Sequence, residues 1–337
     1  MKKLTAALSL FSLGLVLLSA SPASAQPFYQ GKTLTIVVGY KAGGGYDTTA
    51  RLLSRHIGRF IPGNPTVIVQ NMPGANSIIA ANYVYRVAKP DGLTIGTFNR
   101  NLPLAQMTKE KGVEFDITKF SWLGSAASEA SVLTIRADLP YKTAEDAKNA
   151  KSTIVIGATG PGANTYDHPA LLKEYLGFPF KIITGYSSSA DIMLAIERKE
   201  VDGRSGSYSS LAKFIQRGVV RPIIRTRISI PEIASLPVDE NLTTNKDAKA
   251  LLRVRSAPEE VGRPYVAPPG VPADRLKILR EAFEKVLKDP QVLAEGEKAE
   301  LDLSYTNGEE CLKTVKEIMD QPPHIVEAFK KLFAASN

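Results

Sequence analysis

The sequence predicts an α/β fold with largely parallel sheets. Short apolar runs rich in β-branched residues alternate with helix-length stretches through residues 33–225, which is typical of strand–helix–strand units. Two of the strand-to-helix connections are rich in glycine. From residue 272 onward the pattern changes to consecutive helices.

The predicted elements follow from this alternation. Seven strands are expected, at 33–38, 66–70, 94–98, 132–135, 153–157, 180–184 and 220–225. Helices are expected between them at 47–60, 77–87, 143–149, 169–176 and 190–199, and then at 273–288, 290–298, 308–319 and 323–333. The segment 229–264, rich in Pro, Asp, Glu and Asn, is expected to be a crossover or a long surface excursion.

The first glycine turn is the most informative feature of the chain. The strand at 33–38 is followed by Gly43, Gly44 and Gly45, and then by Asp47 as the expected cap of a helix. Only glycine lets the backbone turn sharply there and expose its N–H groups to a ligand. Because a helix N-terminus adds unpaired donors and partial positive charge, we expect this turn to bind an anion.

A second glycine turn repeats this arrangement. The strand at 153–157 leads into Gly160-Pro161-Gly162, with Asn164, Asp167 or His168 as the expected helix cap and Pro169 in the first helical turn. Ligands of open α/β sheets lie at the carboxyl ends of the strands, where both turns fall. We therefore expect two lobes whose glycine turns face each other across a cleft.

The N-terminus has the layout of a secretory signal peptide. Lys2 and Lys3 precede an apolar stretch at 4–18, and Ala23-Ser24-Ala25 provides small residues before a cleavage point. The stretch is shorter than the roughly 20 residues that a spanning helix needs. We expect residues 1–25 to be removed and the mature protein, starting at Gln26, to be exported.

Composition excludes several classes of function. A net charge of +8 over 337 residues comes without a dense basic tract, so no nucleic-acid partner is expected. Cys311 is the one cysteine and the three histidines are far apart, so neither a metal nor a cofactor is expected. The glycine spacing does not match a dinucleotide or P-loop motif, and no Gly-x-Ser-x-Gly occurs. We expect no catalytic residues.

Motifs along nearly the whole mature chain resemble one family, the solute receptors of tripartite tricarboxylate transporters, or Bug-type periplasmic binding proteins. The first turn, 39–47 followed by Ala50-Arg51, resembles the family's glycine loop. Further matching stretches are 69–75, 89–95, 139–145, 185–203 and 268–273. The chain departs from the family pattern at Tyr46, where Thr is usual, at Ala42, where Pro is usual, and at 257–265, which suggests a divergent branch.

The resemblance implies a type II periplasmic binding protein fold with two lobes, a hinge and an interlobe cleft. Lobe 1 would take residues 26–128 and 226–337, and lobe 2 residues 129–225. The implied function is a periplasmic receptor, not an enzyme, that captures a small carboxylate or dicarboxylate. Its implied partners are two integral-membrane transporter subunits, bound transiently by a monomer. A ligand-binding sensor and an exported α/β hydrolase remain alternatives; the hydrolase would need a nucleophile, a base and an acid in one cleft.

The resemblance also implies where the ligand binds. The two glycine loops would hold one carboxylate through backbone groups and ordered water, and side chains across the cleft would bind its far end. Arg204 is the expected reader of a second carboxylate, with Arg100 as the other cationic candidate. The expected ligand-binding residues are Tyr40, Lys41, Ala42, Gly43, Gly44, Gly45, Tyr46, Asp47, Asn99, Arg100, Thr159, Gly160, Pro161, Gly162, Ala163, Asn164, Tyr186, Arg204, Ser205 and Tyr208.

Overall fold

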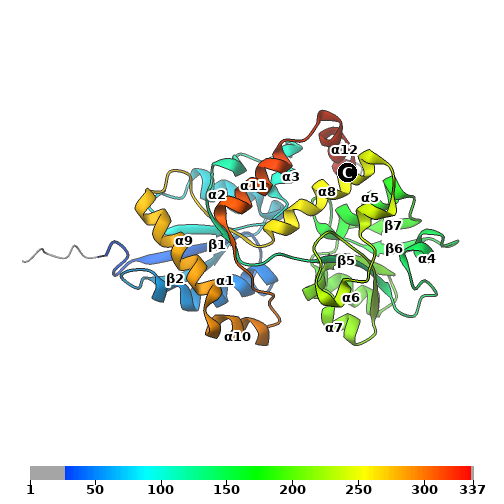
Figure 1. The fold of residues 1–337 in the computed structure, drawn as a ribbon, viewed down its shortest axis with the longest axis horizontal. Helices are drawn as coiled ribbons and strands as arrows, with labels where there is room; N and C mark the ends of the chain where they lie inside the picture. The colour runs from blue at the N-terminus through cyan, green and yellow to red at the C-terminus, as the bar shows by residue number, and fades with distance from the viewer. Residues whose placement is uncertain (1–26, 335–337) are drawn as a thin grey trace, which may run out of the picture.

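The computed structural model describes residues 27–334, which form two α/β lobes side by side, each built on its own sheet (Figure 1). The expected signal peptide and cleavage point lie outside the described residues. All seven strands expected from the sequence are present, with ends that shift by at most two residues.

The first sheet is mixed and has the strand order β11-β4-β10-β3-β1-β2. Strand β1 pairs in parallel with β2 and β3, whereas β10 is antiparallel to both of its neighbours. The strands are β1 (Thr33–Val38), β2 (Thr66–Asn71), β3 (Thr94–Thr97), β4 (Ser121–Ser125), β10 (Pro264–Ala267) and β11 (Thr306–Asn307).

The second sheet has the order β7-β6-β8-β5-β9. Strand β6 is parallel to β7 and β8, and β5 is antiparallel to β8 and β9. The strands are β5 (Ser131–Arg136), β6 (Ile154–Gly157), β7 (Phe180–Ile183), β8 (Gly203–Ser207) and β9 (Val220–Arg225). Strand β8 was not expected from the sequence, because Gly-Arg-Ser-Gly-Ser has no apolar alternation; its pairing with β5 and β6 defines it.

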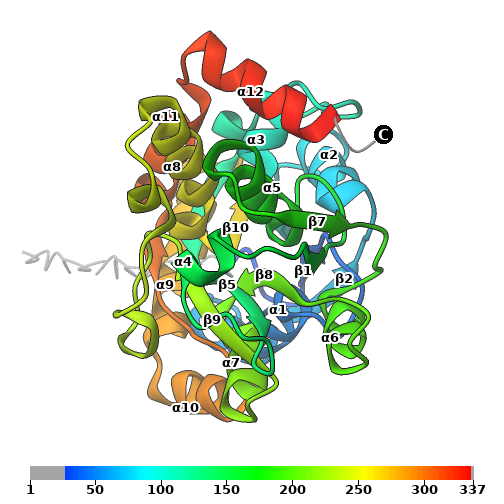
Figure 2. The ribbon, with the colours of Figure 1, turned by 90° about the vertical axis from the view of Figure 1, so that its right-hand side faces the viewer.

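Helices cover both sheets (Figure 2). With the first sheet are α1 (Gly45–His56), α2 (Ile78–Arg86), α3 (Leu102–Met107), α9 (Ala273–Lys288), α10 (Pro290–Lys298) and α11 (Gly308–Met319). With the second are α4 (Ala144–Lys148), α5 (Asn164–Leu176), α6 (Ser189–Glu197), α7 (Tyr208–Gln216), α8 (Lys246–Val261) and α12 (Pro323–Ala334). Short 3-10 turns occur at Ile57–Phe60, Ala75–Ser77, Ile117–Lys119, Pro231–Ile233 and Asp239–Leu242.

The expected assignment of all of 226–337 to lobe 1 is wrong for two helices. Leu251 of α8 and Phe329 of α12 are buried in one hydrophobic cluster with Leu133 and Ile156 of the second sheet. Helix α12 lies beside α5 and α8, and Figure 2 shows it running across the top of the molecule. The apolar side of α12 needs burial, and the turn after α11 directs it onto lobe 2.

Helix α8 also corrects the expected surface excursion at 229–264. It is a 16-residue helix with Pro258 inside it and nine buried residues. The end of α8 at Val261 packs with Val37 and Trp122 of the first lobe, whereas Leu251 packs with the second. Since α8 joins two cores, its sequence has no simple surface-helix stripe, and this helix becomes part of the connection between the lobes.

Candidate functional site

The first glycine loop forms a turn held by its own helix. Helix α1 begins at Gly45, and Gly44 is its N-cap with extended backbone angles. Asp47 is therefore inside the first turn rather than at the expected cap position. Its carboxylate accepts a hydrogen bond from the backbone nitrogen of Gly43 at 2.9 Å, which fixes the loop from within the helix.

Asp47 is held by more than this one hydrogen bond. It also accepts hydrogen bonds from the Nε of Arg51 at 2.9 Å and the Nδ2 of Asn71 at 2.8 Å. Burial raises the pKa of Asp47, but the hydrogen bonds from Arg51, Gly43 and Asn71 outweigh it and hold the pKa below its usual range. Asp47 is thus a fixed anion that organises the loop rather than a group that receives a ligand.

The loop itself is open to a ligand. Residues 41–45 are exposed, and a Cβ built on Gly43 or Gly44 would have no heavy atom within 4 Å. Gly43 has a φ of 91°, which disfavours any other residue there. Lys41 and Ala42 flank this free space. The loop therefore has open space around Gly43 and Gly44 at the N-terminus of α1, where the anion cradle is predicted.

The second glycine loop has the same internal hydrogen bond. Helix α5 begins at Asn164, and the backbone nitrogen of Gly162 donates to Oδ1 of Asp167 at 2.9 Å. The expected capping by Asn164, Asp167 or His168 is wrong, because Ala163 is the N-cap and no side chain caps the helix. Pro169 lies inside the helix rather than in its first turn. A Cβ on Gly160 would again meet open space.

The two aspartates differ in their surroundings. Oδ2 of Asp167 is buried with no hydrogen-bond partner, whereas both oxygens of Asp47 accept bonds. Burial raises the pKa of Asp167 to about 7, against the opposing charge of Arg255 and the bond from Gly162. The second loop is therefore held by a carboxyl that takes up a proton near neutral pH.

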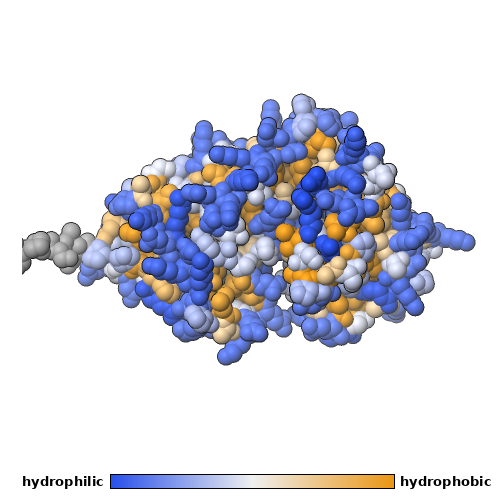
Figure 3. Space-filling view, viewed as in Figure 1, coloured by the Kyte–Doolittle hydropathy of each residue, from blue (hydrophilic) through white to orange (hydrophobic). Residues whose placement is uncertain are grey.

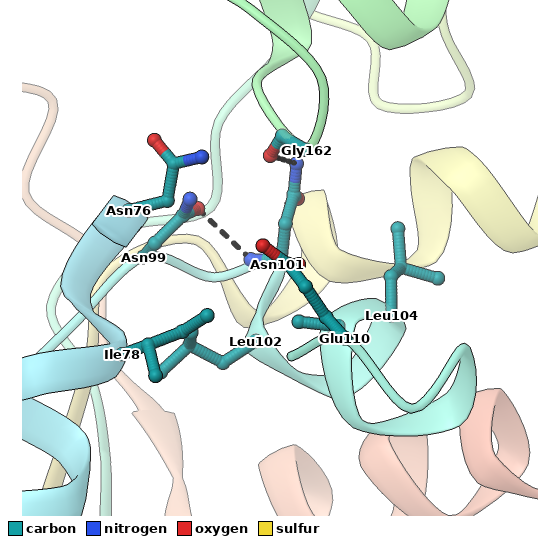
Figure 4. A pocket seen from close by; sticks show the side chains of 9 residues that line it. Asn76, Ile78, Asn99, Asn101, Leu102, Leu104, Glu110 and Gly162 are labelled. Carbon is teal, nitrogen blue, oxygen red and sulfur yellow. Dashed lines mark hydrogen bonds between the residues drawn. The ribbon is translucent and has the colours of Figure 1, made fainter. Parts of the chain in front are cut away.

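Two asparagines of the first lobe contact the second loop (Figure 4). Nδ2 of Asn101 donates to the carbonyl oxygen of Gly162 at 3.1 Å, and Nδ2 of Asn76 donates to that of Pro161 at 3.2 Å. The backbone nitrogen of Asn101 in turn donates to Oδ1 of Asn99 at 3.0 Å. The second glycine loop thus faces the first lobe, as the two-lobed prediction requires, but the residues it touches there are asparagines rather than the first loop itself.

A strained turn places these groups beside the first loop. Ala75, Asn76 and Ser77 have φ values of 43°, 48° and 79°, each in the left-handed region that costs a non-glycine residue about 1–2 kcal/mol. The hydroxyl of Ser77 donates to the carbonyl oxygen of Gly39 at 3.1 Å and accepts from the backbone nitrogen of Asn99 at 3.2 Å. Sequence reasoning missed Asn76 and Ser77, although the Gly74-Ala75-Asn76 turn was a signal for them.

A buried ion cluster lies behind the first loop. Glu129, in the segment that joins β4 to β5, pairs with the guanidinium groups of Arg100 and Arg263. Arg263 also donates to the carbonyl oxygen of Gly45 at 2.9 Å and to the hydroxyl of Thr49. Burial raises the pKa of Glu129, but the charges of Arg100 and Arg263 outweigh it and lower the pKa to about 2.

This cluster changes the expectation for Arg100. Its guanidinium is buried and paired with a carboxylate of the chain, so it is not free to bind a second carboxylate as expected. Its backbone nitrogen donates to the hydroxyl of Tyr46 at 3.1 Å, and that tyrosine also stacks on Tyr40 with ring centroids 4.9 Å apart. Tyr46, the departure from the family pattern, therefore connects the first loop to the segment after β3.

A second buried pair supports the other loop. Arg255 of α8 donates to Glu259 at 2.8 Å and to the side-chain oxygen of Asn164. Glu259 accepts a bond from the hydroxyl of Thr226 at 2.5 Å, and its backbone oxygen accepts from the nitrogen of Glu129 at 3.1 Å. Charged side chains thus reach from the connecting segments to both glycine loops. None of them except Arg100 was expected as a functional residue.

Arg204, the expected reader of a second carboxylate, is buried in the second lobe. Its side chain is 1% exposed, and its Nη2 donates to Ser210 at 2.9 Å while Nε lies 3.3 Å from the sulfur of Met193. Among the described residues no carboxylate forms an ion pair with it. Burial lowers the pKa of Arg204 to about 10. A Cβ on Gly206 would touch its Nη1, so the guanidinium extends toward the C-terminal end of β8.

Ser205 is not beside Arg204 in space, because successive residues of a strand point to opposite faces. Its buried hydroxyl contacts Nδ1 of His168 at 2.8 Å and donates to the carbonyl oxygen of Val132 at 3.2 Å, so the expectation that it binds ligand is wrong. Tyr186 and Tyr208 are half-buried against the α6 and α7 side of the sheet, on the same side as Arg204. Thr159 bonds to Thr165 within the second loop.

Neither a metal-binding cluster nor a membrane-spanning helix is found among the described residues. Within 27–334 no group of three or more His, Cys, Asp or Glu side chains could hold a metal ion. In that same part of the chain, no helix has both the length and the apolar character needed to cross a membrane. Figure 3 shows a hollow between the two lobes at the lower edge of the molecule.

Comparison with known proteins decides the family. A family model described as "Tripartite tricarboxylate transporter family receptor" matches residues 59–330. The chain belongs to this family. It is 25% identical over 322 residues to a UPF0065 protein of Cupriavidus necator, covering 92% of this chain and 91% of that protein. The predicted family resemblance is confirmed.

Solved structures of the same kind confirm the predicted two-lobed fold. The periplasmic binding protein BugD superposes with a TM-score of 0.69 at 24% identity, covering 90% of this chain and 98% of that chain. MatC of Rhodopseudomonas palustris with bound malate superposes with a TM-score of 0.65 at 18% identity, covering 90% of this chain and 99% of that chain. The chain is thus a solute-binding receptor of the tripartite tricarboxylate transporter family with a periplasmic binding protein fold.

Proposed function

We propose that this receptor binds a small organic acid with at least two acidic or polar ends in the cleft between its lobes. The observation that carries the proposal is the pair of glycine loops, each tied to a helix N-terminus by the same backbone-to-aspartate bond and each open to space. Exposed N–H groups at helix N-termini favour a carboxylate. The malate found in the related MatC structure agrees with this ligand class.

Arg204 is proposed to bind the far end of the ligand. Its guanidinium is buried, forms no ion pair with a carboxylate of residues 27–334, and extends toward the C-terminal end of β8. A buried charge without a counter-ion is costly, so a second carboxylate of the ligand would stabilise it. Tyr186 and Tyr208 are proposed to line the same wall.

The proposed role also covers export, partners and chemistry. Residues 1–25 direct export, and the mature protein acts in the periplasm as a monomer that passes its ligand to two membrane subunits. It carries out no chemistry on the ligand. Ser205 is hydrogen-bonded to His168, and Oδ2 of Asp239 lies 3.3 Å from Nε2 of His168. These three residues give no support to a hydrolase, because each of them is 0% exposed.

A thermal-shift screen tests this function. Mature protein would be heated with matched series of mono-, di- and tricarboxylates of equal chain length. A ligand at a hundred times its Kd stabilises a protein by about 2.7 kcal/mol, so a true ligand raises the Tm clearly. A dicarboxylate is expected to give the largest shift, and small-angle scattering is expected to show a smaller radius of gyration with it. No shift with any acid would contradict the proposal.

A further inference from the structure

A cavity of about 530 Å³ lies away from the glycine loops, between α8, the C-terminal end of α11 and the segment after β9. Its volume is in the range of small-molecule sites, which run from about 300 to 1,000 Å³. Its lining shares no residue with the cleft groups described above. In Figure 1 α8 and α11 lie in the upper part of the molecule, above the sheets.

The rim of this cavity is cationic. Arg227, Lys246, Lys249 and Arg253 line it, and the one carboxylate in the lining is Glu317. Glu240 lies nearby, with its oxygens 3.7 Å from Nε of Arg227 and 3.8 Å from Nε of Arg253. These separations are beyond hydrogen-bond length, so Glu240 neutralises the two arginines weakly. Four cations therefore face two carboxylates.

The placement of the lysines is unfavourable without an anion. Lys246 and Lys249 are in the first turn of α8, where the helix dipole disfavours positive charge. Neither lysine forms an ion pair with a carboxylate of residues 27–334. Asp247, the acidic residue of this turn, does not line the cavity and instead lies 3.5 Å from His324. An anion in the cavity would interact favourably with the N-terminus of α8 and would reduce the repulsion among the four cations.

The floor of the cavity is apolar. Ala250, Val254 and Ala257 follow one side of α8, and Ile318 faces them from α11. The two alanines leave space that a larger side chain would fill. A cationic rim over an apolar floor is complementary to a molecule with one anionic head and one apolar body.

We propose that this cavity is a second binding site, for an amphipathic organic anion such as an aromatic or medium-chain acid. The site is independent of the carboxylate cleft, since it uses the N-terminal half of α8 rather than either glycine loop. An occupant contacts both α8 and α11, whose side chains pack together where the two lobes share one hydrophobic cluster.

Fluorescence titration with anilinonaphthalene sulfonate, an anion with an apolar body, tests the site on the mature chain. The wild type is expected to give one saturable site. The double variant Lys249→Gln/Arg253→Gln is expected to bind about tenfold more weakly, a difference of about 1.4 kcal/mol. The variant Ala250→Leu removes volume without changing charge, and it is expected to weaken binding by a similar factor.

Two controls make the outcome decisive. Lys285→Gln/Lys298→Gln removes the same charge from exposed positions on α9 and α10, and it is expected to bind as the wild type does. Gly44→Val alters the cleft and is also expected to keep the affinity. The proposal is overturned if both cavity variants bind like the wild type, if the control pair loses as much as the cavity pair, or if Gly44→Val abolishes the signal.

Discussion

Asn101 of the first lobe donates its side-chain amide to the backbone oxygen of Gly162 in the second lobe, 3.1 Å away. Because Asn101 is also held by Oδ1 of Asn99, this bond ties the second glycine loop to the wall built by Ser77 and Gly39. The two loops are thus connected through side chains of the first lobe rather than by direct contact. A bond at this point exists only when the lobes are together, so it favours the closed arrangement.

Replacing Asn101 with Ala is therefore expected to weaken closure. A hydrogen bond of this kind contributes about 0.5–1.5 kcal/mol, so ligand affinity should fall by roughly twofold to tenfold. Titration calorimetry measures the loss, and small-angle scattering should show a larger radius of gyration at partial saturation. Asn241→Ala, which alters an exposed asparagine in the 3-10 turn Asp239–Leu242, is the matched control. Equal affinity in both variants would mean that this bond does not contribute to closure.

A side chain at Gly44 is expected to block the cradle. The position has extended backbone angles and open space around a built Cβ, so Gly44→Val should fold normally. The added methyl groups would lie where the carboxylate approaches the N-terminus of α1, and binding should be abolished. Calorimetry would measure the affinity and a melting curve the fold. Full affinity in a folded Gly44→Val protein would show that this loop does not bind the ligand.

Arg204→Ala is expected to discriminate between ligands. Removing one partner of a buried charge pair typically costs about 2–5 kcal/mol, so a dicarboxylate should lose far more affinity than its monocarboxylate analogue. Arg198→Ala removes an exposed arginine of the same lobe and should affect neither ligand. Calorimetry with the two acids makes the comparison. Equal losses for both would show that Arg204 does not bind the far carboxylate.

Asp167 is expected to make stability depend on pH. Its pKa is raised from 3.8 to about 7 in the folded protein, so the folded state holds a proton that the unfolded state has released. This contribution is complete below the unfolded pKa and is lost as pH rises through the folded value. Stability should therefore fall between about pH 4 and 7, and Asp167→Asn, which keeps an acceptor for Gly162, should remove that fall.

Urea unfolding at about pH 5 and about pH 8 measures this effect. Each pKa unit corresponds to about 1.36 kcal/mol, so the Asn variant should gain at least ~1 kcal/mol relative to the wild type at the higher pH. Asp320→Asn, an exposed aspartate, provides the control. If the difference in the free energy of unfolding between the wild type and Asp167→Asn is the same at both pH values, Asp167 is ionised in the folded protein.

Local signals in the sequence determined much of the fold. Helices α9, α10 and α11 have the predicted bounds, because their apolar spacing and flanking turns are encoded within a few residues. The seven expected strands are present with small shifts at their ends. Both glycine turns are also present, because a sharp turn in the backbone favours glycine. The family could also be identified from the sequence, since its motifs are contiguous stretches.

Only the tertiary structure decided which groups meet. The polar strand β8 exists because β5 and β6 supply its partners, and α12 packs on lobe 2 because an apolar helix face is buried against whichever core is in reach. Arg100 and Arg204 look alike in the sequence, yet Glu129 pairs with one and no carboxylate of the described chain pairs with the other. Propensity acts over three or four residues, whereas an ion pair depends on where distant segments come together, and that is fixed only when both cores form.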